Sequence, residues 1–282
     1  MLAEILAEHA SISASMARDG DGLRPGHAYV APADRHLILA DGVVRLGHGP
    51  RENMSRPAID PLLRSAGACF GPRAIGVVLT GMLNDGASGL ADLKRCGGVT
   101  VVQTPRDAAA ADMPWEALRA SDVDYRAPLS DLPALLAELS AQEAGPRAEI
   151  PADIADEVEI ALGTPRSAVL PKGLSEISPL TCPDCGGVLS RIRRLPPLRY
   201  RCQVGHAYTA EALATHQGGT VDEALRLALR IVEERIALTE AMLAEACHAG
   251  RGAAAASYAE RLAESRAHAD VLRRAIGGIR PP

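Results

Sequence analysis

The chain has 282 residues, of which 47% are hydrophobic and only 2% aromatic, and its formal net charge is −5. This length has room for one substantial α/β domain and a smaller module, while the negative charge argues against general electrostatic binding of nucleic acid. No apolar run approaches the roughly 20 residues that a membrane span needs, and the acidic N-terminus lacks the basic region of a signal peptide. Three of the six cysteines cluster with a histidine, which suits a reducing compartment better than disulfides do. We therefore expect a cytoplasmic protein.

Short strands and helices alternate through the first half of the chain. The expected strands are three within residues 27–46 and one each at 75–79 and 99–103. The expected helices occupy residues 57–69, 87–96 and 114–119. This alternation predicts an α/β fold with a parallel sheet and helices on both faces.

The composition changes in the second half. Residues 141–178 are rich in Pro, Gly, Ala and Glu, and we expect a linker there with one short acidic helix. Residues 179–217 are compact and rich in Cys, Gly and Arg. Apolar residues at helical spacing then predict a helical hairpin over residues 220–277, with Thr220 and Glu223 as a capping box at its start.

One acidic residue follows an aliphatic strand in a Gly-rich turn. Asp85 lies within Thr80-Gly-Met-Leu-Asn-Asp-Gly86, directly before a helix-like segment. Parallel α/β sheets present functional side chains at the carboxyl ends of their strands. Asn-Asp-Gly taken alone is typical of an ordinary turn, so the surrounding sequence has to decide between a functional and a structural role.

Further segments accompany this turn in a fixed order. They are Pro25-Gly-His-Ala-Tyr-Val-Ala-Pro-Ala-Asp-Arg-His36, Ser55-Arg-Pro-Ala-Ile-Asp60, Gly97-Gly-Val-Thr-Val-Val-Gln103 and Asp112-Met-Pro-Trp-Glu-Ala117. Together with the Asp85 turn they resemble the catalytic domain of the chemotaxis protein-glutamate methylesterases, the CheB family. The resemblance covers roughly residues 1–138 and predicts a partial methylesterase domain at residues 1–140.

The resemblance implies a cofactor-independent serine hydrolase that acts on methyl-accepting chemoreceptors in bacterial chemotaxis. Such an enzyme removes methyl groups from glutamyl esters, and some relatives also deamidate glutamine. In that family a Ser attacks the ester, a His transfers the proton, and an Asp orients the His. Asp85 occupies the Asp position, and Met82 borders the site, where a backbone N–H can help to hold the developing oxyanion.

The chain departs from the family pattern because it contains no Gly-x-Ser-x-Gly turn for the nucleophile. We expect Ser11, Ser13 and Ser15 to lie in a polar loop. We expect the histidines of the hairpin region to be structural or surface residues: His27, His36 and His48. Leu83 stands where the family commonly has Gly. Either the first strands of the domain are missing from this chain or the chain is an inactive remnant, and the order of the remaining segments favours the first explanation. We expect little or no esterase activity from the chain as written.

A second constellation has metal-ligand spacing. Cys182-Pro-Asp-Cys185 and Cys202-Gln-Val-Gly-His206 form two ligand pairs on two turns, as in a zinc ribbon. Three thiolates and one imidazole would complete a tetrahedral shell, which predicts a structural rather than a catalytic Zn²⁺. A redox Cys-x-x-Cys or a coincidence of thiols is the alternative, and His216 is a possible substitute ligand.

Five arginines accompany this ribbon: Arg191, Arg193, Arg194, Arg199 and Arg201. We expect them to form a solvated basic face, with a docking surface for an acidic partner as the sharper alternative. The second function that we consider is accordingly a non-catalytic zinc-ribbon adaptor that binds chemoreceptors or another acidic partner.

Overall fold

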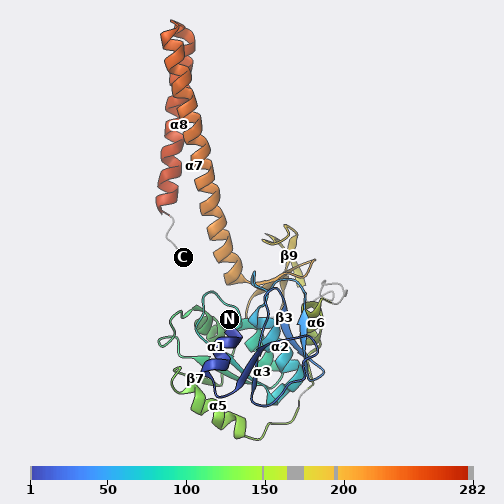
Figure 1. Ribbon diagram of the computed structural model, residues 1–282. Helices are drawn as coiled ribbons and strands as arrows, with labels where there is room; N and C mark the ends of the chain where they lie inside the picture. Colours follow the sequence, from blue (N-terminus) through green and yellow to red (C-terminus); the bar gives the residue numbers. More distant parts are fainter. Residues whose placement is uncertain (1, 148, 164–174, 194–195, 279–282) are drawn as a thin grey trace. The chain divides into compact units, whose positions relative to one another are not determined.

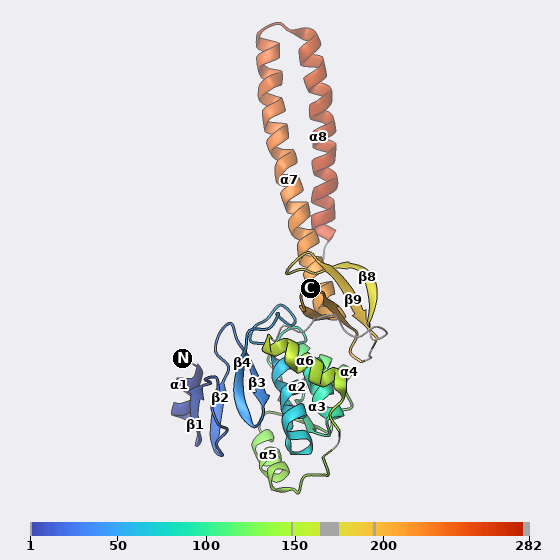
Figure 2. The same ribbon diagram turned by 90° about the vertical axis from the view of Figure 1, so that its right-hand side faces the viewer.

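The computed structural model describes residues 2–147, 149–163, 175–193 and 196–278. The chain divides into two compact units, Met1–Leu213 and Ala214–Pro282. Figures 1 and 2 show the first unit as the mixed α/β part and the second as a pair of long helices.

A three-stranded parallel sheet forms the middle of the first unit. Its strands are β5 (Ile75–Val78), β6 (Val99–Gln103) and β7 (Tyr125–Ala127), in that order. Ile75 pairs with Val99, and Val101 pairs with Tyr125. The three-residue η1 turn (Gly71–Arg73) leads into this sheet.

Helices cover both faces of the sheet, as the sequence predicted. One face packs on α2 (Ile59–Phe70), α3 (Ala87–Arg95) and α4 (Asp112–Ala120), and the other packs on α5 (Leu132–Ala141). Val102 of β6 belongs to the first hydrophobic cluster, whereas Val101 belongs to the second. Successive side chains of a strand point to opposite faces, so a near-continuous run of Val in β6 serves two cores.

Two glycines let α2 and α3 approach each other closely. A Cβ atom on Gly67 would lie 2.8 Å from the Leu93 Cα atom, and one on Gly89 would lie 2.5 Å from the Asp60 carbonyl oxygen. Both distances are far below ordinary van der Waals contact, so only glycine fits at these positions. The close packing fixes the start of α2 beside the loop that precedes α3.

The N-terminal part adds two small sheets. Helix α1 (Leu2–His9) precedes β1 (Ser13–Met16), which pairs in parallel with β2 (His27–Val30). Strands β3 (His36–Ala40) and β4 (Val43–Gly47) form an antiparallel hairpin. The expectation that Ser13 and Ser15 lie in a loop was wrong, because pairing with β2 imposes a strand on a segment without a strong local preference.

The expected acidic helix is α6 (Ala152–Leu162), which ends at Gly163 in the left-handed conformation. It belongs to the core of the first unit and not to an isolated linker. Ile154 is fully buried, and Val158 and Ala161 pack on Ile38 of β3. The composition of residues 141–178 predicted this helix but not its packing on β3.

The Cys-rich segment forms a four-stranded antiparallel sheet in the order β11-β10-β9-β8. Its strands are β8 (Ser175–Thr181), β9 (Val188–Ile192), β10 (Arg199–Cys202) and β11 (Ala207–Thr209). Leu189, Tyr208 and Leu213 form its buried core, and Met54 from the loop before α2 packs on that core. The sheet therefore shares its hydrophobic core with the first half of the chain.

Two helices form the hairpin, α7 (Ala210–His248) and α8 (Gly252–Gly278). Ion pairs join them at Glu240–Arg266 (2.7 Å) and Glu233–Arg273 (2.9 Å). The expected capping box was wrong: Thr220 lies inside α7 and its hydroxyl donates to the His216 carbonyl (3.0 Å). In the part of the chain that the structure describes, neither these helices nor any other has the length and apolar character to cross a membrane.

Candidate active site and metal centre

Asp85 lies at the carboxyl end of β5, in the loop that leads into α3. Its carboxylate accepts backbone hydrogen bonds from Ile59 (2.7 Å), Asp60 (3.2 Å) and Gly86 (3.0 Å). Ile59 and Asp60 begin α2, and Ala58 before them has no polar side chain to cap the helix. Asp85 therefore caps α2 from another part of the chain, where the helix dipole favours a negative charge.

The neighbourhood of Asp85 makes its ionisation costly. Burial raises the pKa of Asp85 to about 6, even though its three backbone hydrogen bonds favour the ionised form. Burial, together with the charge of Asp85, raises the pKa of Asp60 to about 7. Asp60 accepts hydrogen bonds from the Asn53 side chain (2.9 Å) and the Gly89 backbone (2.6 Å). Two carboxyl groups thus share one site, where they titrate near neutral pH.

Met82 lies in the loop between β5 and α3. Gly81 donates to the Ala110 carbonyl (3.1 Å) before it, and Leu83 donates to the Asp112 carboxylate (3.3 Å) after it. The Met82 side chain is 74% exposed. Leu83 has a φ of 63°, the left-handed region that favours glycine. The loop is therefore anchored on both sides of Met82.

The structure brings Ser15 and His27 together, which the sequence analysis missed. The Ser15 hydroxyl lies 2.7 Å from His27 Nε2, and Arg24 Nη2 lies 3.4 Å from the same nitrogen. The pair sits on β1 and β2, and the described residues place no carboxylate on it. This contact depends on the pairing of β1 with β2, in which Ser13 lies opposite His27. That pairing cannot be read from the sequence.

The other histidines have structural partners. His36 is fully buried, its Nε2 lies 3.0 Å from the Pro50 carbonyl, and its Nδ1 accepts from the Ala58 backbone N–H (3.3 Å). Burial lowers the pKa of His36. His48 lies 3.3 Å from the Asp34 carboxylate on the surface. Among the described residues, all hydrogen bonds to Asp85 come from backbone N–H groups. None of these imidazoles is therefore hydrogen-bonded to its carboxylate.

The four predicted metal ligands converge. The ligand atoms of Cys182, Cys185, Cys202 and His206 all lie within 4.8 Å of one another. Cys185 Sγ lies 3.7 Å from Cys202 Sγ, and His206 Nδ1 lies 3.5 Å from Cys202 Sγ and 3.6 Å from Cys182 Sγ. Zn–S bonds of about 2.3 Å and Zn–N bonds of about 2.0 Å place tetrahedral ligands about 3.5–3.8 Å apart. The three contacts therefore fit a tetrahedral zinc site.

Two glycine turns shape the ligand loops. Gly186 donates to the Cys182 carbonyl (2.8 Å), and Gly205 donates to the Cys202 carbonyl (3.0 Å), both glycines with positive φ. The Tyr208 hydroxyl donates to Asp184 (2.6 Å) and lies 3.2 Å from Cys182 Sγ. His216 lies on α7, where its Nδ1 is 3.3 Å from the Thr220 hydroxyl.

The expected basic face was wrong for two of its arginines. Arg199 and Arg201 are buried, with 4% and 3% of their surface exposed, whereas Arg191 and Arg193 are exposed. Arg194 lies outside the described residues. Arg199 binds Glu157 through hydrogen bonds of 2.9 and 3.0 Å, and Arg201 lies 3.3 Å from the same carboxylate. Burial without these partners would be very costly, so the ribbon is joined to α6 by charge.

Arg64 of α2 completes this buried cluster. Its guanidinium binds Glu52, Glu157 and Asp92, each at 2.9 Å. We call the six residues the Arg64 cluster: Arg64, Arg199, Arg201, Glu52, Asp92 and Glu157. Three positive and three negative side chains balance one another in it.

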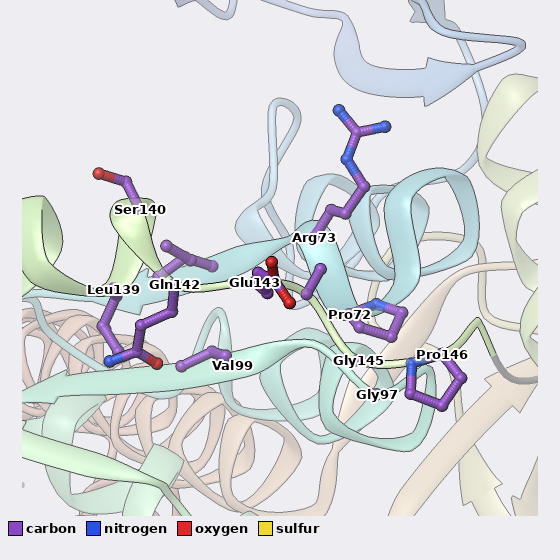
Figure 3. A pocket seen from close by; sticks show the side chains of 12 residues that line it. Pro72, Arg73, Gly97, Val99, Leu139, Ser140, Gln142, Glu143, Gly145 and Pro146 are labelled. Carbon is purple, nitrogen blue, oxygen red and sulfur yellow. The ribbon is translucent and has the colours of Figure 1, made fainter.

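A cavity lies at the end of β5 opposite to Asp85, and a smaller cleft lies beside the Asp85 loop. The cavity has a volume of about 660 Å³ and lies at the amino ends of β5 and β6. Figure 3 shows residues that line it, among them Pro72, Gly97 and Val99. Asp85 follows the opposite, carboxyl end of β5. A smaller cleft of about 160 Å³ is lined by Asn84 and Thr209, directly beside the Asp85 loop. The smaller cleft is therefore the one next to the candidate chemistry.

Comparisons with known proteins concern the first half of the chain. Residues 1–136 match the family model described as CheB methylesterase. A protein-glutamate methylesterase/protein-glutamine glutaminase 1 of Geobacter metallireducens is 41% identical over 126 residues, which are 43% of this chain and 35% of the relative. A protein-glutamate methylesterase/protein-glutamine glutaminase of Yersinia pestis bv. Antiqua is 40% identical over 147 residues, which are 50% of this chain and 42% of the relative.

A solved structure is also similar. The crystal structure of the Thermotoga maritima CheB methylesterase catalytic domain is 32% identical, with a TM-score of 0.47, and the match covers 49% of this chain and 75% of that chain. The chain spans about two fifths of the length of the curated relatives named above, with 35% and 42% of their residues aligned.

Proposed function

Residues 1–136 of this chain belong to the CheB methylesterase family, and from that premise we propose that it serves the demethylation of glutamyl methyl esters on methyl-accepting chemoreceptors. The names of the relatives add deamidation of protein glutamine as a second reaction of the same site. The observation that carries the proposal is the position of Asp85, at the carboxyl end of β5 and in the matched region.

Asp85 would act as the acid that orients the catalytic histidine. A carboxylate offers about four acceptor positions, and backbone N–H groups use three of those on Asp85. Since no other donor among the described residues contacts this carboxylate, one position is left for an imidazole N–H. The ionised carboxylate would then stabilise the imidazolium that forms when a serine attacks the ester. The backbone N–H of Met82, in a loop anchored on both sides, is the group that we propose for the oxyanion.

The substrate is a protein side chain, so the site must be open to a partner surface. Asp85 is half-buried and Met82 is exposed, which fits access from the side of the loop. We propose a cytoplasmic chemoreceptor as that partner, in a bacterial chemotaxis pathway. The nucleophile and the base are not supplied next to Asp85 by the residues that the structure describes.

Methanol release from a receptor carrying labelled methyl esters tests this function. We expect background release from the chain alone, and release above background from the chain extended by the in-frame sequence that precedes Met1. Asp85→Ala should abolish the release from the extended protein, whereas Asp122→Ala, on an exposed acid, should leave it unchanged. Release that is insensitive to Asp85→Ala, or no release from the extended protein, would contradict the proposal.

A non-catalytic adaptor is the second candidate, and the capping role of Asp85 favours it. Two of the three hydrogen bonds to Asp85 come from the start of α2, so the carboxylate already serves the fold without an imidazole. Receptor binding at undiminished affinity by both the original and the extended protein, without methanol release from either, would support the adaptor. The burial of Arg199 and Arg201 removes two arginines from the surface that it would use.

We further propose that the Cys-rich module at residues 179–217 is a zinc ribbon with a structural Zn²⁺ held by Cys182, Cys185, Cys202 and His206. It would follow the esterase-type domain at 1–140 and the segment at 141–178, and precede the hairpin at 220–277. Elemental analysis of freshly purified protein should give one equivalent of zinc. Cys182→Ser should lose it, and Cys247→Ser, on an exposed cysteine of α7, should not. Less than one equivalent in the unaltered protein would refute the site.

A further inference from the structure

The strand that follows the last proposed metal ligand is hydrogen-bonded to the esterase-type domain. His206 is followed by β11, whose Ala207 donates to the Arg51 carbonyl (3.2 Å) and accepts from the Asn53 backbone N–H (2.8 Å). Glu52 and Ala207 form a parallel bridge. The strand after the ligand loop is therefore hydrogen-bonded to the segment just before α2.

Thr209, the last residue of β11, contacts the loop that carries Asp85. The side-chain amide of Asn84 donates to the Thr209 hydroxyl. Asn84 is only 2% exposed and directly precedes Asp85. The Thr209 hydroxyl also accepts from the Ala212 backbone N–H (3.2 Å) at the start of α7. One hydroxyl thus connects the ribbon, the Asp85 loop and the first turn of a helix.

A second route runs from Thr209 to Asp85 through the start of α2. The Thr209 backbone N–H donates to the Asn53 side chain (3.1 Å), whose amide donates to the Asp60 carboxylate (2.9 Å). The Asp60 backbone N–H in turn donates to Asp85 (3.2 Å). Both routes depend on the position of β11.

The ribbon is too small to hold that position by its own packing. Among the residues that the structure describes, its hydrophobic cluster has five buried members, two of which are proposed metal ligands. Modules of this size generally need a metal to fold. The loss of metal should therefore disorder the ligand loops first, and β11 follows one of them without an intervening residue.

We propose that the metal-loaded ribbon fixes the Asp85 loop through Thr209, so that Thr209 is a positioning residue and the metal controls the order of the acid-bearing loop. This inference rests on the proposed metal site and on the proposed role of Asp85, but it concerns a contact that neither of them requires. Its consequence is a hydrolase whose acid is ordered only when a separate metal site is filled.

Hydrogen exchange of the full chain tests the inference without an activity assay. In Thr209→Val, with one equivalent of zinc still bound, the amides of residues 82–87 should exchange about tenfold faster, because one buried hydrogen bond is lost. Thr209→Ser keeps the hydroxyl and should restore slow exchange. Thr220→Val is the matched control, because among the described residues the Thr220 hydroxyl contacts only His216, one turn earlier in α7. The β6 amides of residues 100–102 should keep their protection throughout.

Removal of the metal with a chelator tests its role. Removal of zinc from the unaltered protein should speed exchange of residues 82–87 at least as much as Thr209→Val does. Unchanged exchange of this loop in Thr209→Val with zinc bound, or in the zinc-free protein, would overturn the inference. So would the absence of zinc from the unaltered protein, which would also remove the metal site. A failure of the proposed esterase function would appear only in the methanol assay and leave the exchange results unaffected.

Discussion

The buried and half-buried carboxyl groups of this protein occupy two contrasting environments. In the Arg64 cluster, Glu157 contacts three guanidinium groups. Burial alone would raise its pKa, but the arginines outweigh burial and lower the pKa of Glu157 and likewise of Glu52. At Asp85 and Asp60 the hydrogen-bond donors are backbone amides and an asparagine, and burial raises both pKa values.

The difference distinguishes a structural site from one suited to chemistry. Carboxylates paired with arginines stay ionised over the whole physiological range, so they give rigidity but no proton exchange. Carboxyl groups held by neutral donors change charge near neutral pH, which is typical of catalytic sites. In this chain the first environment joins the ribbon to α2 and α6, and the second lies at the end of β5.

The largest expected effect comes from breaking the Arg64 cluster. Glu157→Gln keeps the shape of the side chain but leaves three buried guanidinium groups against two carboxylates. Removing one partner of a buried ion pair typically costs about 3–5 kcal/mol. Urea unfolding of the full chain should show this loss, with Glu149→Gln, on an exposed glutamate, as the control. A loss below about 1 kcal/mol would show that the cluster does not join the ribbon to the domain.

The contact between α2 and α3 beneath Asp85 should be the next most sensitive. Gly89→Ala places a Cβ atom 2.5 Å from a backbone oxygen of Asp60. Overpacking of this kind costs about 1–3 kcal/mol. Gly218→Ala is the matched control, because that glycine lies within α7 with open space around it, and alanine should stabilise the helix by up to about 1 kcal/mol. Equal unfolding midpoints for the two variants would contradict the close approach.

The pH dependence of Asp85 should have the sign opposite to that of Glu157. A carboxyl group whose pKa rises on folding from 3.8 to about 6 binds its proton more tightly in the folded chain. Its contribution to stability is therefore greatest at low pH and falls as the pH rises from about 4 to 6. NMR of the side-chain carboxyl carbon should give a midpoint near 6 for Asp85. A midpoint below 4 would place Asp85 in the same class as Glu157.

The stability of Asp85→Asn separates the titration of the Asp85–Asp60 pair from that of His36. The pKa of His36 is lowered by burial, so its contribution to stability is lost as the pH falls, in the opposite direction. The difference in unfolding free energy between the unaltered protein and Asp85→Asn cancels the His36 contribution. The unaltered protein should therefore lose stability relative to Asp85→Asn as the pH rises through the Asp85 midpoint.

The smallest expected effect concerns the backbone of the loop. Leu83 adopts a φ of 63° and is 40% exposed, so its side chain adds strain and little burial. Leu83→Gly removes a left-handed penalty of about 1 kcal/mol, most of which the greater freedom of glycine in the unfolded chain offsets. We expect a stabilisation below about 1 kcal/mol in thermal unfolding. A clear destabilisation would show that the Leu83 side chain packs on the site.

The sequence was sufficient where local pattern and burial agree. The aliphatic run at Ile75–Val78, the Gly-rich turn at Asp85 and the helix at Ala87–Arg95 all follow from periodicity and turn chemistry. The convergence of the four candidate metal ligands follows from their spacing, because two close pairs need only one hairpin to meet.

The sequence was insufficient where a residue depends on a distant partner. Nothing near Arg199 in the chain reveals that Glu157, 42 residues away, will bind it, so a solvated position was the natural expectation. Ser15 and His27 meet through strand pairing that neither segment encodes alone. The helix α6 was expected, but its packing was not, because its apolar face is explained only by contact with Ile38 of β3.

The balanced charge of the Arg64 cluster has a consequence for the response to salt. Its guanidinium groups have 0–5% of their side-chain surface exposed, so dissolved ions cannot come between the partners. The ion pairs between α7 and α8 are about half exposed, with values of 47–59% for Glu240–Arg266 and 49–52% for Glu233–Arg273. Ionic strength screens the second kind of pair much more than the first. Concentrated salt should therefore weaken the ion pairs between α7 and α8, whereas the ribbon should stay bound to the esterase-type domain through the Arg64 cluster.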